Sequence, residues 1–276
     1  MQMKMILGTY SNILYPVRFP ILTGLIAFFT SIPDRMKNLS GRILTYTKLI
    51  SILFFILLIN ISTQSQTTKT PFTLQEGDLL FQNLDCGDFC NAVEKVTIGY
   101  KGARFSHVAI VAKDSTGNLV VIEAVSRGVS IISVKDFFNK SHDKNNNPKV
   151  IVGRLLPQYQ HLIPKAIKEA YKLLGHKYDD VFCSTNDSYY CSELIYEIFK
   201  RANNSKEVFE LVPMTFKDPD TKETFPIWTK YFQDLNKPIP EGEPGNNPGG
   251  ISLSKKIKIV YAYGIPNGWP TNLIKY

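Results

Sequence analysis

The chain has 276 residues, 44% of them hydrophobic and 20% charged, which is enough to bury the core of one large or two small domains. Its formal net charge is +8, but residues 1–64 contain six Lys or Arg and a single Asp, which leaves 26 basic against 23 acidic residues in the remainder. A net of +3 is too small to indicate nucleic acid as a partner, and we expect none.

The N-terminal region has the order of basic, apolar and small residues that is typical of a secretory signal. Residues 49–61 are uncharged and mostly apolar, small polar residues follow them, and basic residues precede them at Lys37, Arg42 and Lys48. We expect cleavage near Ser65. An apolar segment over 43–61 is instead long enough for an uncleaved anchor, so both outcomes stay open. Residues 1–64 are thus predicted to be an N-terminal extension with a signal peptide or membrane anchor, and the protein to be exported to the periplasm or cell envelope.

Residues 65–276 are predicted to form one domain of strands and helices. A turn at Gly77 leads into a short strand, and apolar, β-branched segments predict further strands at 105–112, 119–125, 129–134, 150–155 and 257–263. Periodic apolar positions indicate helices at 89–96, 163–174 and 226–235, whereas the Pro- and Gly-rich residues 238–250 indicate an extended loop. Consecutive strands joined by tight turns, with helices before and after them, indicate an α+β fold with an antiparallel sheet packed against helices.

One more helix carries a cysteine in the position of an activated nucleophile. Apolar residues recur with helical period over 187–202, and Asp187 or Ser188 is expected to cap this helix. Cys191 then lies in the first turn, on the inward face, near the positive end of the helix dipole, which favours the thiolate. The alternative is a structural thiol, because free cysteines are among the most buried residues.

The remaining cysteines are Cys86, Cys90 and Cys183. An exported chain can pair two of them, but four cysteines in about 200 residues do not make a disulfide scaffold. Cys86 and Cys90 stand four apart without a second Cys or His pair at zinc-ligand spacing, so we predict no metal site.

Two polar residues interrupt neighbouring apolar strands. His107 precedes the apolar residues 108–112 and Glu123 lies within a Val- and Ile-rich segment, and such groups are costly to bury unless their polar atoms find partners. A turn at 114–118 makes the two strands adjacent, so an imidazole–carboxylate contact is expected. A cysteine nucleophile needs a base, and the base needs an orienting group. Cys191, His107 and Glu123 are therefore the candidate catalytic residues, although His107 alone would more commonly be a hydrogen-bonded core residue.

Five segments of the chain form a recognisable series: Gly-Asp-Leu-Leu-Phe-Gln at 77–82, Phe-Ser-His-Val-Ala-Ile-Val at 105–111, Ile-Glu-Ala at 122–124, Tyr-Asp-Asp-Val-Phe at 178–182 and Tyr-Cys-Ser-Glu-Leu-Ile at 190–195. In this order they resemble the YiiX/YaeF-like permuted papain-like amidases, circularly permuted relatives of the NlpC-type cell-wall peptidases. The resemblance implies a circularly permuted papain-like (NlpC-type) fold. It also implies Cys191 as nucleophile, His107 as general base and Glu123 as the residue that orients His107.

In papain-like sites the N–H of the nucleophile and a nearby side chain stabilise the oxyanion, and Tyr178 or Gln82 is the candidate for that side chain here. The resemblance covers about 74–202, so we expect a core at 74–205 and a C-terminal extension at 206–276 that sets specificity.

Three functional hypotheses follow. The first is an exported cysteine amidase or peptidase, without a cofactor, that cleaves amide bonds in cell-wall peptides. The second keeps the same three residues but acts on lipid acyl groups as a hydrolase or acyltransferase. The third is a binding module that has the fold without turnover. The oligomeric state is not predicted.

Overall fold

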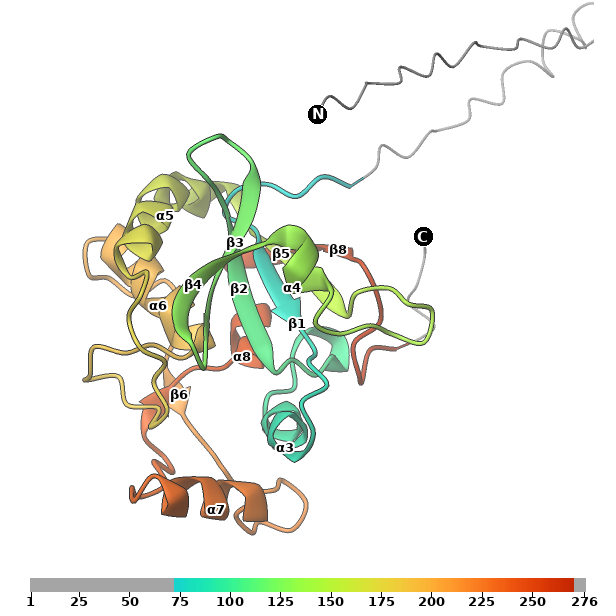
Figure 1. Cartoon of the computed structure of the whole chain (residues 1–276), viewed down its shortest axis with the longest axis vertical. Helices are drawn as coiled ribbons and strands as arrows, with labels where there is room; N and C mark the ends of the chain where they lie inside the picture. Colours follow the sequence, from blue (N-terminus) through green and yellow to red (C-terminus); the bar gives the residue numbers. More distant parts are fainter. Residues whose placement is uncertain (1–71, 271–276) are drawn as a thin grey trace, which may run out of the picture. The chain divides into compact units, whose positions relative to one another are not determined.

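A computed structural model describes residues 72–270 of the chain (Figure 1). Their centre is a six-stranded antiparallel sheet with the order β4-β3-β2-β1-β5-β8. Its strands, in sequence order, are β1 (Leu79–Gln82), β2 (His107–Lys113), β3 (Leu119–Val125), β4 (Gly128–Ser133), β5 (Val150–Leu155) and β8 (Ile257–Ala262). The edge strand β8 comes from the C-terminal part of the chain, so residues beyond 206 complete the sheet.

The helices connect and cover the strands. The α-helices are α3 (Asp88–Val96), α4 (Val134–Phe138), α5 (Ile163–Lys172), α6 (Cys191–Ala202), α7 (Pro226–Asp234) and α8 (Pro248–Ser252). Two 3-10 helices, η2 (Tyr100–Gly102) and η3 (Pro157–Leu162), lie between them. The α+β class with an antiparallel sheet is therefore confirmed.

Alternation along β2 divides its side chains between two apolar layers. Val108 and Ile110 enter the layer formed with α5 and α6, while Ala109 and Val111 enter the layer that contains Phe137 of α4. Figure 1 shows these helices on either side of the sheet. Because both faces of the central strands are covered, their sequences are continuously apolar, which makes His107 and Glu123 stand out.

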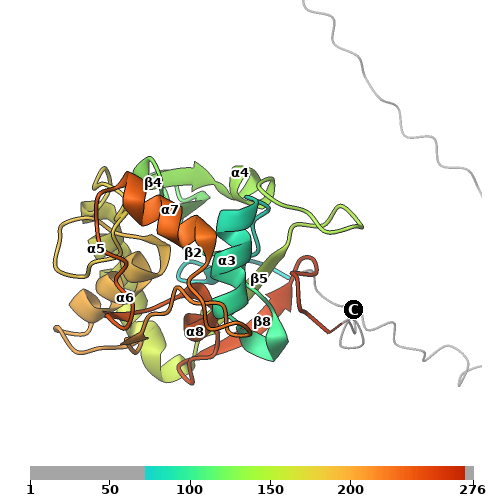
Figure 2. The same ribbon diagram turned by 90° about the horizontal axis from the view of Figure 1, so that it is seen from below.

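A third apolar cluster lies where α3 and α7 run side by side (Figure 2). The ring of Phe89 in α3 lies 4.7 Å from that of Trp228 in α7, centroid to centroid. Phe182 and Phe216, from two separate loops, place their rings 5.7 and 5.1 Å from Trp228. We call Phe89, Phe182, Phe216 and Trp228 the aromatic cluster.

The prediction of one extended loop over 238–250 is wrong. Within it, β7 (Pro244–Gly245) pairs with β6 (Val212–Pro213), and α8 follows. Asn247 caps α8 by accepting the N–H of Gly250 at 2.7 Å, and Pro248 occupies the first helical position, where a missing N–H is tolerated. A side-chain cap and a proline thus order a segment that lacks apolar periodicity.

The other predicted elements are present, with ends shifted by up to two residues, except that α6 begins later than its expected caps at Asp187 or Ser188 require. Among residues 72–270 no helix combines the length and the apolar character needed to cross a membrane. The predicted signal peptide or anchor and the boundary at residue 64 lie outside the described residues.

Candidate active site

Helix α6 begins at Cys191 itself, so the thiol lies at the first helical position and is nearly buried, with 8% of the residue exposed. The first N–H groups of a helix have no partner within it, and the helix dipole is positive there, so this position stabilises negative charge on sulfur. Glu193, two residues on, accepts the N–H of Tyr190 at 3.3 Å and closes the entry to the helix.

The prediction that Asp187 or Ser188 caps this helix is wrong, because the residue before the helix is Tyr190, whose backbone is extended. Ser188 forms a parallel bridge with Lys177, and its N–H donates to the Asn186 side chain at 2.9 Å. Asp187 instead lies 3.2 Å from the Nδ1 of His176. Because of these contacts the helix starts later in the chain, and Cys191 is its first residue.

His107 is the first residue of β2 and is buried, with 3% exposed. Its Nε2 lies 2.8 Å from Oε2 of Glu123, and its side chain also interacts with that of Cys191. Burial by itself lowers the pKa of His107, but hydrogen-bonding and charge interactions with Cys191 and Glu123 outweigh it and raise the pKa to about 9. The structure thus brings together the three residues that the sequence singled out.

Glu123 is fully buried in β3 and has two further charged neighbours that the sequence did not reveal. Lys140, just after α4, donates to its Oε1 at 2.6 Å, and Arg127 lies 3.5 Å from the same oxygen. Burial raises the pKa of Glu123, but His107 and Lys140 outweigh it and lower the pKa to about 2. A carboxylate that stays ionised in the core is suited to hold a protonated imidazole.

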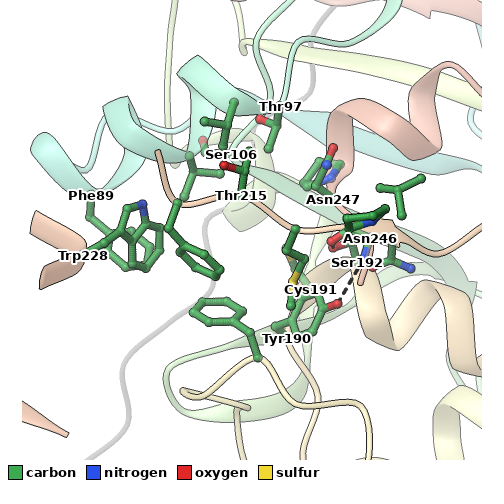
Figure 3. Close-up of a pocket in the computed structure, with 18 of the residues that line it drawn as sticks. Phe89, Thr97, Ser106, Tyr190, Cys191, Ser192, Thr215, Trp228, Asn246 and Asn247 are labelled. Atoms are coloured by element: carbon green, nitrogen blue, oxygen red, sulfur yellow. Dashed lines mark hydrogen bonds between the residues drawn. The ribbon is translucent and has the colours of Figure 1, made fainter. Parts of the chain in front are cut away.

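Cys191 opens into a cavity of about 260 Å³ (Figure 3). Figure 3 shows Phe89 and Trp228 on one side of the cavity and Ser192, Asn246 and Asn247 on the other, with Cys191 between them. The aromatic cluster forms much of the wall, joined by aliphatic residues from α3 and from β6 and the residues after it. The space next to the thiol is therefore mainly apolar on one side and carries amide groups on the other.

The two candidate oxyanion side chains are placed differently. Tyr178 lines the cavity, and burial raises the pKa of its hydroxyl well above the ordinary value. Gln82 pairs with His107 across β1 and β2, but it is fully buried, does not line the cavity, and its Nε2 donates to the carbonyl of Phe137 at 2.9 Å. The structure places only Tyr178 at the cavity.

The loop after Tyr178 is held in an unusual conformation. Asp179 is buried, and its carboxylate accepts the N–H groups of Val181 and Cys183 and the side-chain amide of Asn186. Between these anchors Phe182 has a φ of 53°, which is rare for a bulky residue. Backbone strain of this kind persists where the surroundings fix it, and here it directs an aromatic ring into the cavity wall.

Comparisons with known proteins identify the fold and the family. A family model described as "Permuted papain-like amidase enzyme, YaeF/YiiX, C92 family" matches residues 73–261. The crystal structure of the metalloprotein yiiX from Escherichia coli O157:H7 has the same fold, with a TM-score of 0.55, 22% sequence identity, and coverage of 70% of this chain and 99% of that chain. A search of curated proteins found no match. The family match runs well past residue 202, where the sequence resemblance ended.

The yiiX protein is described as a metalloprotein, so we asked whether the side chains here fit a metal ion. Within residues 72–270 no group of three or more His, Cys, Asp and Glu side chains is arranged to hold one. Cys86 and Cys90 are joined in a disulfide, with 5.3 Å between their Cα atoms. The donor set of the described residues does not fit a metal centre.

Proposed function

This chain belongs to the permuted papain-like amidase family, and from that premise we propose that it is a hydrolase whose nucleophile is Cys191. The observation that carries the proposal is the approach of His107 to both Cys191 and Glu123 at the start of α6. The family supports amide hydrolysis, and the contacts of His107 support the roles that we propose for these residues.

A pKa of about 9 keeps His107 protonated at neutral pH, next to a sulfur at a helix start. The thiolate attacks the carbonyl carbon of an amide and forms a tetrahedral oxyanion, near the N–H of Cys191 and the hydroxyl of Tyr178. His107 then gives its proton to the nitrogen as the C–N bond breaks, which releases the amine and leaves an acyl-enzyme. Water next attacks the thioester, with His107 accepting its proton, and releases the acid. Glu123 keeps the ring oriented throughout.

We propose a peptide amide of the cell wall, reached after export, as the substrate, because the sequence resembles relatives of the NlpC-type cell-wall peptidases. The disulfide between Cys86 and Cys90 supports export, because such bonds persist in oxidising compartments. Together with the basic and apolar leader, it favours the periplasm or cell envelope as the location, with a membrane tether if residues 43–61 stay uncleaved.

A second candidate is an acyl-lipid hydrolase or acyltransferase that uses the same residues. The observation that favours it is the apolar wall next to Cys191, since four aromatic rings surround space enough for part of an acyl chain. In that case the acyl-enzyme forms in the same way, and an alcohol leaves in place of an amine.

Alkylation by iodoacetamide tests the nucleophile, and the chain supplies its own control. Cys191 and Cys183 are the two free thiols of the described residues, and Cys183 is exposed while Cys191 is buried. At pH 6 an ordinary thiol, with a pKa near 8.5, is less than about 1% ionised. We expect Cys191 to react faster than Cys183 despite its burial. A faster reaction at Cys183 would contradict the proposal.

Product release tests the substrate. The protein and its Cys191→Ala variant are incubated separately with cell-wall stem peptides and with phospholipids. New amino groups that depend on Cys191 would support the amidase, and fatty acid release that depends on Cys191 would support the lipid hydrolase. Reactive Cys191 with turnover of neither substrate would favour the binding module.

A further inference from the structure

The amide side chain of Asn246 is buried beside Cys191 without hydrogen-bond partners. Only 6% of the residue is exposed, and neither its Oδ1 nor its Nδ2 has a partner among residues 72–270. Six buried side-chain polar atoms of these residues lack partners, and three of them, the two of Asn246 and Nε1 of Trp228, belong to residues that line the Cys191 cavity. Unmatched polar atoms in a core are rare, and each of them calls for an explanation, of which a functional role is one.

The backbone of Asn246 is tied to both neighbours of the thiol. Its N–H donates to the hydroxyl of Tyr190 at 3.2 Å, and its carbonyl accepts the hydroxyl of Ser192 at 3.1 Å. Figure 3 shows Asn246 next to Ser192 and Cys191, with the bond to Tyr190 drawn as a dashed line. The residues before and after Cys191 thus fix the position of Asn246, so its side chain has a set location relative to the sulfur.

Asn246 also separates two hollows. One is the Cys191 cavity, and the other, of about 410 Å³, lies toward α8 and shares Val212, Asn246 and Asn247 with the first. Its far side carries the charged residues Glu210, Lys255 and Lys256. A substrate extending from the apolar cavity into this second hollow would pass the Asn246 side chain.

The neighbouring Asn247 shows what an ordinary asparagine does in this loop. Its Oδ1 accepts the N–H of Gly250 and caps α8, so its side chain has a structural role. The side chain of Asn246 caps no helix, and Asn246 holds this loop only through the hydrogen bonds of its backbone. A side-chain amide has one donor group and one acceptor, the complement of a peptide amide.

We propose that the side chain of Asn246 binds a substrate amide next to the bond that is cut, donating through Nδ2 to its carbonyl and accepting through Oδ1 from its N–H. This proposal rests on the proposed function of Cys191. It narrows the substrate to compounds with an amide adjacent to the scissile carbonyl, as in a peptide, and it disfavours simple ester lipids. Asn246 is then a binding residue that determines specificity.

The test compares two alkylating probes that differ in one atom. One is an N-acetyl amino-acid chloromethyl ketone, and the other has an oxygen in place of its amide N–H. Each rate constant for Cys191 is divided by the iodoacetamide rate of the same protein, so that a change in thiol reactivity cancels. We expect the unmodified protein to prefer the amide probe about tenfold, as for one buried hydrogen bond. We expect Asn246→Leu to lose this preference.

The control variant is Thr215→Val. Thr215 lines the same cavity, but its hydroxyl donates to Glu241 at 2.9 Å, so the probe ratio should not change. Asn246→Ala, which loses both the donor and the acceptor, provides a second variant if Asn246→Leu does not fold. Thermal unfolding of Asn246→Leu distinguishes a structural role of Asn246 from a role in binding. Leucine removes unmatched polar atoms from the core, so the melting temperature of the variant should not fall if the side chain only binds substrate.

Equal reactivity of the two probes in the unmodified protein, or the same preference in the Asn246 variants, would overturn the proposal. So would a clear loss of thermal stability in Asn246→Leu with the probe ratio intact. Failure of the proposed nucleophile has a different signature, because Cys191 would then react with iodoacetamide more slowly than Cys183 in the unmodified protein.

Discussion

On the sheet side of Cys191, charged groups are matched in detail: Glu123 is held by His107, Lys140 and Arg127 within 3.5 Å. Toward the cavity, aromatic rings form much of the wall, and three buried polar atoms of the lining residues, two in Asn246 and one in Trp228, are unmatched. The first arrangement sets protonation states before a substrate arrives. The second leaves hydrogen-bonding capacity for a ligand. We infer that the sheet side sets reactivity and the cavity side sets recognition, and the following experiments test that division.

The largest effect is expected from Glu123→Gln. Losing the carboxylate removes an interaction that raises the pKa of His107, so the ring is less protonated at neutral pH and less well oriented. We expect kcat/KM to fall at least about 100-fold, by analogy with loss of the orienting acid in other triads. The alkaline limb of the pH–rate profile should move from about 9 toward the ordinary histidine range.

Lys140→Met is the matched control for that experiment, because Lys140 contacts Glu123 without being placed against His107. Its effect on rate should be smaller than that of Glu123→Gln. An unchanged pH profile in Glu123→Gln would contradict the assignment of reactivity to this side.

A second large effect, on stability, is expected from Trp228→Ala. Trp228 is almost fully buried and contacts Phe89, Phe182 and Phe216, so truncation leaves a void in the aromatic cluster. We expect the free energy of unfolding to fall by about 3–5 kcal/mol, measured by denaturant titration. KM should rise, while the iodoacetamide rate of Cys191 should change little. If Cys191 lost as much reactivity in Trp228→Ala as in Glu123→Gln, the separation of reactivity from recognition would be contradicted.

A moderate effect is expected when the Cys86–Cys90 disulfide is reduced. The bond spans the start of α3, the helix that places Phe89 in the cavity wall. Closing so short a loop stabilises a fold by about 2 kcal/mol in the chain-entropy account. Reduction should therefore lower the free energy of unfolding by that amount, with Cys183→Ser as the control. An unchanged melting curve after complete reduction would show that α3 does not need the bond.

A pH-dependent effect is expected at Glu193. Burial, together with nearby Asp179, raises the pKa of its carboxyl from 4.5 to about 8. The folded state thus holds a proton that the unfolded state releases between pH 4.5 and 8. Stability should therefore be greatest below pH 4.5 for this group and fall by up to about 1.4 kcal/mol per pH unit until pH 8.

The Glu193→Gln variant should lose this component of the pH dependence, because glutamine has no proton to release. Denaturant titration of both proteins at pH 5, 6, 7 and 8 measures the difference. Parallel curves for the two proteins would mean that Glu193 is ionised in the folded state.

The sequence by itself determined the strands and the main helices, and it singled out Cys191, His107 and Glu123 as candidates. Apolar alternation and helical period are local properties of a chain, and His107 and Glu123 were visible because each interrupts a buried strand. A short turn then made their strands neighbours, so their contact followed from local information as well.

Only the tertiary structure decided what surrounds those residues. Lys140 and Asn246 lie in segments without periodicity, and their places depend on contacts with residues far along the chain. The start of α6 was also misplaced, because a bridge between Ser188 and Lys177 outweighs the capping tendency of Asp187. Local patterns indicate which residues are buried, whereas the partners of a polar group depend on packing between distant parts of the chain. The proposed recognition residue Asn246 is a polar group of this kind, so only the tertiary structure could reveal it.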